Sequence, residues 1–285
     1  MRNATETAAR PTVGLFGFGG FGQLIADHLA PHVDLRIHDP YTSVFGGVSL
    51  IEAAEADVVI LSVPVSEVRG ICEDIGDFLK PGAMVVDVGS VKISPIADMV
   101  ECLPDHVQIV GTHPLFGPQS AKAGIAGHNI ALCPVRGSDW RMVRSFLSRV
   151  LKLRVITCTP EEHDKEAAMV QGLTHLIAKV ITEMGPLPTR MTTASFELLS
   201  QAIEMVKDDP PTVLQAIEAS NPFAAQVRAQ FFERAERLKE TFESADFAAQ
   251  NCHEQRNDPF IGVDLHAKTG SMQPIIQSSF KTALT

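Results

Sequence analysis

The stretch TVGLFGFGGFGQLIADHLA, residues 12–30, decides the fold of this chain. It opens with an apolar run over residues 13–16, continues with Gly17-x-Gly19-x-x-Gly22, and ends with apolar side chains at helical spacing over residues 23–29. This order predicts a strand, a tight turn and a helix. Such glycines let the backbone approach a pyrophosphate, and the helix directs its N-terminus toward the anion.

An acidic residue follows at the distance that a dinucleotide site requires. The segment LRIH over residues 35–38 predicts a second strand, and Asp39 comes directly after it, 22 residues beyond Gly17. A carboxylate there accepts hydrogen bonds from the ribose hydroxyls of NAD and repels the 2′-phosphate of NADP. We therefore expect NAD in preference to NADP. A glycine-rich surface turn is the alternative. The expected cofactor contacts are Gly17, Phe18, Gly19, Gly20, Phe21, Gly22, Asp39, Ser62, Val63 and Pro64.

The rest of the first half alternates between strands and helices. Further apolar runs cover residues 58–63, 84–88, 107–110 and 129–133. This alternation predicts an α/β fold with a Rossmann-type, doubly wound parallel sheet. After about residue 155 only helical patterns remain, over residues 160–185, 192–207, 210–219 and 222–249. We expect a disordered leader over residues 1–11, an NAD(P)-binding domain over 12–155, an all-helical dimerisation and substrate domain over 156–250, and a loose tail over 251–285.

The composition excludes several classes of protein. The formal net charge is −10, and no run of Lys and Arg occurs, so nucleic acid and anionic membranes are poor candidate partners. No apolar run reaches the length of a membrane span. The first residues carry no apolar stretch after their charges, so we expect no secretory signal. The five cysteines are scattered, which argues against a disulfide framework or a zinc site and favours a reducing cytoplasm. We expect no metal.

Polar side chains follow two of the buried strands. Ser90 and Lys92 come after the strand over residues 84–88, and Thr112 and His113 come after the strand over 107–110. Ligands of open parallel sheets bind beyond the carboxyl ends of the strands, so these side chains are expected to share a cleft with the nicotinamide. A histidine accepts a proton near neutral pH, which makes His113 the candidate base. A hydrogen-bonded turn residue is the alternative for a lone histidine.

The first helix of the second half carries a polar face. Gln171, Thr174 and His175 lie three and four residues apart and share one face of the helix. They form either a wall of the substrate site or a polar stripe between helices, and the sequence does not separate the two. His163 precedes His175 by 12 residues on the same helix, too far for both to hold one metal ion.

These motifs together resemble one family. GFGGFGQ (17–23), VPVSE (63–67), DVGSVK (87–92), GTHPLFGPQS (111–120), EEHDKEAAMVQGLTHLIAKV (161–180), FELL (196–199) and NPFAAQVRAQFF (221–232) resemble the prephenate/arogenate dehydrogenases of tyrosine biosynthesis. The sequences of the motifs are most similar to those of the branch that includes plant arogenate dehydrogenases. The resemblance runs from about residue 13 to about residue 242.

The resemblance implies roles for several residues. The N-terminal domain would bind NAD(P)+, and the helical domain would form a homodimer and close the cleft. His113 would bind the ring hydroxyl of the substrate as its base, Ser90 would bind the same hydroxyl and orient His113, and His175 would lie near the substrate. Candidate cations for the substrate carboxylates are Lys92, Lys122, Arg190 and Arg228. Some bacterial members carry an arginine near the start of the helix that here begins at Asn221, and this chain has none there.

The choice between prephenate and arogenate depends on one residue. Arogenate carries an ammonium group where prephenate carries a keto group, so an enzyme for arogenate should offer a carboxylate there. Asp209 either supplies that carboxylate or caps the helix that begins at Pro210, which is the commoner role for such a residue. We therefore expect prephenate as the substrate, with arogenate as the alternative.

Two other classes of function compete with this interpretation. Another two-domain Rossmann dehydrogenase, for 3-hydroxyacids or imines, would carry its catalytic lysine or polar set on the long helix. Lys165 and Lys179 lie on that helix, but in no recognisable pattern. A regulator that senses NAD(H) without turnover would need no base in the cleft, and the pairing of Ser90 with His113 argues against it.

Overall fold

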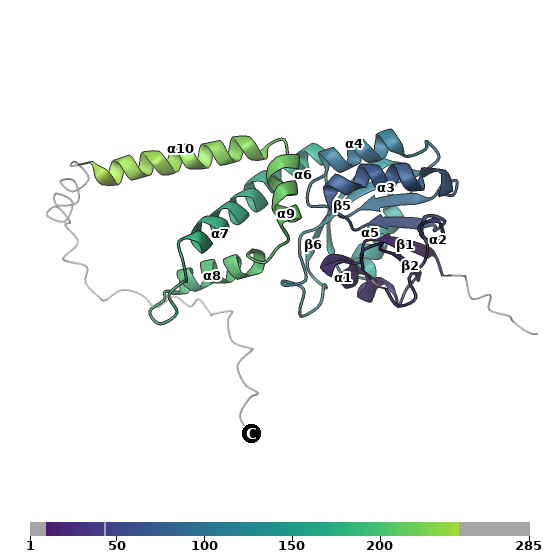
Figure 1. Cartoon of the computed structure of the whole chain (residues 1–285), viewed down its shortest axis with the longest axis horizontal. Helices are drawn as coiled ribbons and strands as arrows, with labels where there is room; N and C mark the ends of the chain where they lie inside the picture. Colours follow the sequence, from purple (N-terminus) through teal and green to yellow (C-terminus); the bar gives the residue numbers. More distant parts are fainter. Residues whose placement is uncertain (1–9, 43, 245–285) are drawn as a thin grey trace, which may run out of the picture. The chain divides into compact units, whose positions relative to one another are not determined.

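A computed structural model describes residues 10–42 and 44–244 of the chain. One seven-stranded sheet, which includes the strands labelled in Figure 1, has the order β2-β1-β3-β4-β5-β6-β7. The strands are β1 (Thr12–Phe16), β2 (Asp34–His38), β3 (Val58–Leu61), β4 (Met84–Asp87), β5 (Gln108–Pro114), β6 (Asn129–Arg136) and β7 (Arg154–Thr157). The chain reverses its direction of winding between β1 and β3, and nucleotides bind at such a switch point.

The sheet is not wholly parallel, which corrects the sequence-based prediction. The strands from β2 to β5 are parallel, but β6 is antiparallel to β5. Pairing with β6 extends β5 as far as Pro114, so Thr112 and His113 lie within the strand and not after it. The edge strand β7 was not predicted, because its side chains are mostly exposed and carry no buried apolar run.

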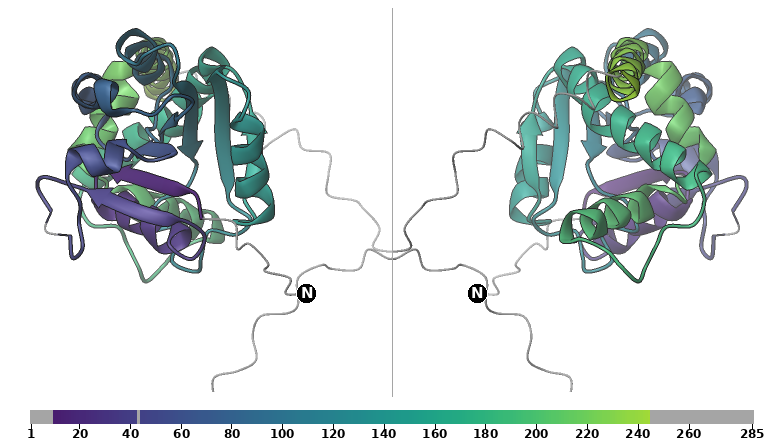
Figure 2. Two further views of the ribbon diagram at one scale, coloured as in Figure 1. Left: turned by 90° about the vertical axis from the view of Figure 1, so that its right-hand side faces the viewer. Right: turned by 90° about the vertical axis from the view of Figure 1, so that its left-hand side faces the viewer.

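Helices cover both faces of the sheet. They are α1 (Gly20–Leu29), α2 (Leu50–Ala54), α3 (Val68–Ile75), α4 (Ile93–Cys102) and α5 (Trp140–Arg149), with short turns η1 (Val65–Glu67) and η2 (Gly76–Phe78). On one face, Val59, Val85 and Ile109 pack with side chains of α2, α3 and α4. On the other, Val110 and Leu132 pack against α5. Figure 2 shows helices on the two faces of the sheet. The expected Rossmann-type α/β architecture is thereby confirmed.

The remaining described elements are helical, as expected. They are α6 (Pro160–Ala167), the π-helical turn η3 (Ala168–Gly172), α7 (Leu173–Glu183), α8 (Ala194–Val206), α9 (Pro211–Gln215), the π-helical turn η4 (Ala216–Ser220) and α10 (Ala224–Glu243). The hydroxyl of Thr159 and the carboxylate of Glu162 form a capping box that begins α6. This fixed start positions the residues that follow on the first turns of α6.

Contacts along the chain divide it into two units, Met1–Phe232 and Glu233–Thr285. All the residues discussed as site residues belong to the first unit. In the second, the described part is the end of α10, where Lys239 pairs with Glu236 one turn away. The expected division near residue 155 remains a prediction. The proposed tail over residues 251–285, Cys252 and most of the proposed leader lie outside the described residues. In the described part of the chain, no helix is long and apolar enough to span a membrane.

Candidate active site

The glycine turn between β1 and α1 has the shape that a bound pyrophosphate needs. Gly17 has a φ of +93°, and a Cβ atom there would lie 2.2 Å from the carbonyl oxygen of Ser62. A Cβ on Gly22 would lie 2.2 Å from the carbonyl oxygen of Gly17. At Gly19, by contrast, no atom of the described chain comes within 4 Å of the Cβ position. The helix α1 starts beside this open space without a side-chain cap, so its first N–H groups are free to bind an anion.

Asp39 lies directly beside this turn. Its carboxylate accepts the backbone N–H of Phe18 at 2.6 Å and those of Tyr41 and Thr42 at 2.8 Å each. Partial burial raises the pKa of Asp39, but these hydrogen bonds outweigh it and hold the pKa below its ordinary value. Arg36 bonds the carbonyl oxygen of Glu52 and pairs with Asp34 instead. The described residues therefore place a negative charge next to the glycine turn, while Arg36 makes its contacts elsewhere.

The other expected cofactor residues border the same turn. Ser62 follows β3, donates its backbone N–H to the carbonyl oxygen of Phe16, and is followed by Val63 and Pro64. The ring of Phe21 lies 6.3 Å from that of Phe116, in the connection after β5. The residues present thus fit a dinucleotide, because the space beside Gly19 is open and a pyrophosphate could approach the backbone there.

Lys92 does not serve as a free cation, which corrects the sequence-based prediction. Its side chain is 0% exposed. Its ammonium donates to both carboxylate oxygens of Asp87, at 2.5 and 2.6 Å, and to the carbonyl oxygen of Thr112 at 2.6 Å. All three N–H bonds are used, so none remains for a substrate carboxylate. Burial raises the pKa of Asp87, and the ammonium of Lys92 opposes that rise.

Thr112 is tied into the same buried cluster. Its hydroxyl donates to the carbonyl oxygen of Asp87 at 2.8 Å, and the residue is 3% exposed. Together with Lys92 it fixes the end of β5 against the end of β4. A role for Thr112 in substrate binding remains a prediction.

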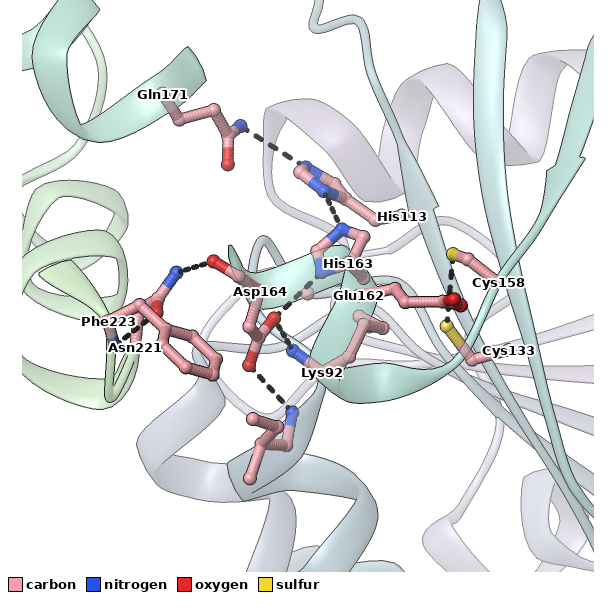
Figure 3. Close-up of polar contacts among 12 residues, drawn as sticks. Lys92, His113, Cys133, Cys158, Glu162, His163, Asp164, Gln171, Asn221 and Phe223 are labelled. Atoms are coloured by element: carbon pink, nitrogen blue, oxygen red, sulfur yellow. Dashed lines mark hydrogen bonds and ion pairs between the residues drawn. The ribbon is translucent and has the colours of Figure 1, made fainter. Parts of the chain in front are cut away.

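His113 is the centre of a hydrogen-bonded chain of side chains (Figure 3). Its Nδ1 lies 2.9 Å from Nε2 of His163, and its Nε2 lies 3.3 Å from the amide nitrogen of Gln171. Gln171 also carries a buried side-chain oxygen that has no hydrogen-bond partner in the described chain. An unpartnered polar atom beside a histidine indicates where a polar ligand would bind.

His163 and Asp164 were not predicted as site residues, although the motif that contains them was recognised. Nδ1 of His163 lies 2.7 Å from a carboxylate oxygen of Asp164. The same carboxylate accepts the backbone N–H groups of Lys92 and Ile93, at 2.7 and 2.8 Å, where α4 begins. Asn221 donates to the carbonyl oxygen of Asp164 at 2.8 Å. Only the pairing of distant segments reveals this arrangement.

The electrostatic surroundings keep His113 neutral. The residue is 5% exposed, and burial lowers its pKa well below the ordinary value, with further lowering from His163 and Lys92. A neutral imidazole has a lone pair and can accept a proton. Ser90 is half-buried at the end of β4, and the described structure shows no hydrogen bond between it and His113. The expected contact of Ser90 with the substrate hydroxyl remains a prediction.

Asp209 contacts His175 and does not cap the helix that follows it. Its Nε2 lies 3.0 Å from a carboxylate oxygen of Asp209, and its Nδ1 lies 3.0 Å from the carbonyl oxygen of Gln171. Burial lowers the pKa of His175, but the bonds to Asp209 and Gln171 outweigh it and raise the pKa above its ordinary value. The cap of α9 is Pro210, without a side-chain hydrogen bond. The expectation that Asp209 caps this helix is therefore wrong.

The remaining candidates are less closely tied to this cluster. The hydroxyl of Thr174 donates to the carbonyl oxygen of Val170 in its own helix, and the residue is exposed. Arg228 pairs with Glu218, so it is not a free cation. Arg190 and Lys122 are exposed, in the connections after α7 and after β5. Their proposed contacts with substrate carboxylates remain predictions.

Comparison with known protein families gives matches over most of the chain. Residues 43–171 match the family model described as "Prephenate dehydrogenase, nucleotide-binding domain", and residues 159–253 match "Prephenate dehydrogenase, dimerization domain". The first match begins after the glycine turn, so the cofactor assignments at Gly17–Gly22 depend on the geometry described above.

Individual relatives differ in the substrate that their names give. "Arogenate dehydrogenase 2, chloroplastic" of Arabidopsis thaliana is 28% identical over 93% of this chain and 77% of its own length. "Probable arogenate/prephenate dehydrogenase" of Methanocaldococcus jannaschii is 25% identical over 69% of this chain, which spans only 46% of that protein. "Prephenate dehydrogenase" of Lactococcus lactis is 25% identical over 76% of this chain and 68% of its own length.

Solved structures share the fold. The prephenate dehydrogenase of Aquifex aeolicus, in complex with hydroxyphenyl propionate and NAD+, superimposes with a TM-score of 0.64 at 21% identity, over 88% of this chain and 99% of that one. The Synechocystis arogenate dehydrogenase gives a TM-score of 0.61 at 16% identity, over 86% and 96%.

Proposed function

Because this chain belongs to the prephenate dehydrogenase family, we propose that it catalyses the oxidative decarboxylation of a 4-hydroxycyclohexadiene carboxylate, a step of tyrosine biosynthesis. The observation that carries the proposal is the neutral His113, buried at the end of β5 with its Nε2 turned toward Gln171. The glycine turn and Asp39, which fit a dinucleotide, follow β1 and β2, which are neighbouring strands of the same sheet.

The chemistry needs a base and correct alignment. Both prephenate and arogenate carry a hydroxyl on ring carbon C4 and a carboxylate on C1. NAD(P)+, when bound, supplies the acceptor for the hydride that leaves C4. His113 accepts the hydroxyl proton at Nε2, the carboxylate leaves as CO2, and its electron pair completes an aromatic ring. The resulting phenolate takes the proton back from His113. Aromatisation drives the reaction, so the protein needs mainly alignment and a base.

The substrate preference that we propose is arogenate over prephenate, which reverses the sequence-based expectation. That expectation depended on Asp209 as a helix cap, and the structure gives Asp209 a different partner. Asp209 lies beside His175, while Lys92 is paired with Asp87 and Arg228 with Glu218. A partly exposed carboxylate at Asp209, with no free cation among these residues, favours the substrate with an ammonium group. Prephenate remains the second candidate, supported by the relative from Lactococcus lactis.

One assay tests the proposal. Reduction of NAD+ and NADP+ is followed at 340 nm with arogenate, with prephenate and with a 3-hydroxyacid. Turnover of either cyclohexadiene is expected, with a higher kcat/KM for arogenate. Turnover of the 3-hydroxyacid alone would assign the chain to another class of dehydrogenase. Tight NAD binding without turnover of any of the three would favour a sensor.

We also propose a homodimer that works in the cytoplasm. The dimer is supported by the match of residues 159–253 to a dimerization domain. It is supported further by large apolar side chains that are exposed on α7 and α8, among them Val180, Leu198 and Met205. Such side chains gain free energy when a second copy covers them. The cytoplasmic location remains a prediction from cysteine usage.

A further inference from the structure

We propose that His163 and Asp164 form a proton relay with His113, so that the base of the reaction is a pair of imidazoles and not His113 alone. The proposal depends on the function proposed above for one point, namely that the proton comes from the substrate hydroxyl. Asp164 acts as a positioning residue, because it fixes His163 and has no contact with His113 itself.

The geometry forms a continuous chain of hydrogen bonds. The carboxylate of Asp164 lies 2.7 Å from Nδ1 of His163, and Nε2 of His163 lies 2.9 Å from Nδ1 of His113. His113, His163 and Asp164 are 5%, 6% and 0% exposed. The two rings meet edge to face, with an interplanar angle of 69° (Figure 3). In the described chain, no group of three His, Cys, Asp or Glu side chains is arranged to hold a metal ion.

The carboxylate determines which nitrogen of each ring carries a proton. A carboxylate only accepts hydrogen bonds, so Nδ1 of His163 carries its proton toward Asp164. In the neutral ring, Nε2 of His163 then has the lone pair and accepts a hydrogen bond from Nδ1–H of His113. The lone pair of His113 is consequently on Nε2, which faces Gln171 and the expected site of the substrate. The chain of bonds thus prepares the atom that accepts the proton.

Electrostatics favours passing the charge onward. A positive charge that stayed on His113 would be buried near the ammonium of Lys92. A positive charge on His163 faces Asp164 directly, and Asp87 also attracts it. The charged groups around the pair are Lys92, which acts on His113, Asp164, which contacts His163, and Asp87, which pairs with the Lys92 ammonium and also attracts a charge on His163. Moving the charge by one ring exchanges a repulsive partner for an attractive one.

The proposed step conserves protons. The substrate hydroxyl gives its proton to Nε2 of His113 while Nδ1 of His113 gives its proton to Nε2 of His163. His163 then carries protons on both nitrogens and pairs with Asp164. The reverse transfer returns one proton to the phenolate. No oxidant or reductant beyond that of the proposed reaction takes part.

The tautomers provide a test that does not need turnover. Protein labelled with ¹⁵N-histidine is examined by long-range ¹H–¹⁵N NMR at pH 8, with signals assigned from His113→Asn and His163→Gln. The relay requires His113 to carry its proton on Nδ1 and His163 to carry its proton on Nδ1. A wild-type His113 with the proton on Nε2 would overturn the proposal, whether or not the enzyme is active.

The kinetic test separates a relay from a packing role. His163→Gln keeps an oxygen that accepts a hydrogen bond from His113 but cannot take a proton. We expect kcat to fall by roughly 10- to 100-fold, part of the usual scale of acid–base catalysis, with KM and cofactor affinity unchanged. In mixtures of H2O and D2O, the wild-type rate should follow a curve that indicates two protons in transit, and the variant rate should follow a straight line.

The matched control is His106→Gln. His106 bonds the carbonyl oxygen of Leu79 and precedes β5 at its opposite end. Its variant should keep the wild-type kcat and the curved dependence on D2O. A straight line for the wild type, or a slow His163→Gln variant that keeps the curve, would refute the relay. A wild type that turns over neither cyclohexadiene contradicts the proposed function, and the NMR result still decides the relay.

Discussion

The Nε2 atom of His175 lies 3.0 Å from a carboxylate oxygen of Asp209, so the segment before α9 presents an acid to the helix that follows Gln171. Asp209 is about one third exposed, and its carboxylate retains lone pairs for a ligand. A substrate ammonium would find a partner there, whereas a keto group would meet a negative charge.

Asp209→Asn should therefore change the choice of substrate. We expect kcat/KM for arogenate to fall by roughly 10- to 100-fold, because a hydrogen bond between charged groups contributes about 1.5–3 kcal/mol. The value for prephenate should stay constant or rise. Steady-state kinetics with both compounds measure this, and Asp208→Asn, an exposed neighbour, serves as the control. Equal losses for both substrates would assign Asp209 a structural role.

Removal of the base should abolish most activity without affecting the cofactor. His113→Asn should lower kcat by roughly 10²- to 10⁴-fold, the scale for a positioned acid–base group. The affinity for NAD+, measured by calorimetry, should hardly change, because the glycine turn lies at other strand ends. Near wild-type turnover would reject His113 as the base.

The pH dependence of the wild type follows from the surroundings of His113. The base must be deprotonated to act, and burial, His163 and Lys92 lower the pKa of His113 well below its ordinary value. We therefore expect kcat/KM to be constant from neutral pH upward and to fall only below pH ~6.5, the ordinary value for histidine. An acid limb centred above neutral pH would show that a different group limits the rate.

Asp39 should control the choice between NAD and NADP. Its carboxylate lies beside the glycine turn and has a lowered pKa, so it is negatively charged in the folded enzyme at neutral pH. The wild type should show a higher kcat/KM with NAD+, and Asp39→Asn should reduce the NAD+/NADP+ ratio by roughly tenfold or more. Asp34→Asn, at the exposed start of the same strand, is the control. A wild-type preference for NADP+ would contradict this role of Asp39.

The pair of His175 and Asp209 should make stability depend on pH. The pKa of His175 is raised in the folded protein, so the folded state holds this proton more tightly than the unfolded state. The resulting stabilisation is complete below pH ~6.5 and is lost as the pH rises through the folded pKa. The free energy of unfolding in urea is compared for wild type and His175→Gln. Their difference, roughly 1 kcal/mol at pH 6, should shrink by pH 9. A difference that grows with pH would refute the assignment.

How much of this could be read from the sequence depends on whether the signal is local. The glycine turn and Asp39 were found because strand, turn, helix and acid follow one another within 22 residues of the motif. His113 was found because it follows a buried apolar run. The edge strand β7 was missed, since an exposed strand of four residues carries no such run.

The errors concern partners that are distant in sequence. His163 and His113 are 50 residues apart, and Asp164 reaches the start of α4 across 72 residues from Lys92. Lys92 was wrongly taken as a free cation, because sequence alone does not show that Asp87 and Thr112 surround its ammonium. Asp209 was misassigned for the same reason: the base rate for helix caps favoured a local partner, and its true partner lies 34 residues away.

The contact between Asp164 and the start of α4 has a consequence for protein engineering. The carboxylate that orients His163 is held by backbone N–H groups of Lys92 and Ile93, which belong to the sheet half of the chain, while Asp164 itself belongs to the first helix of the other half. A chimera that joins the sheet of one relative to the helices of another at residue 158 would combine these partners from different parents. A crossover placed after Gln171 keeps α4, His113, His163 and Asp164 from one parent, and leaves the helices beyond it open to exchange for new substrate preferences.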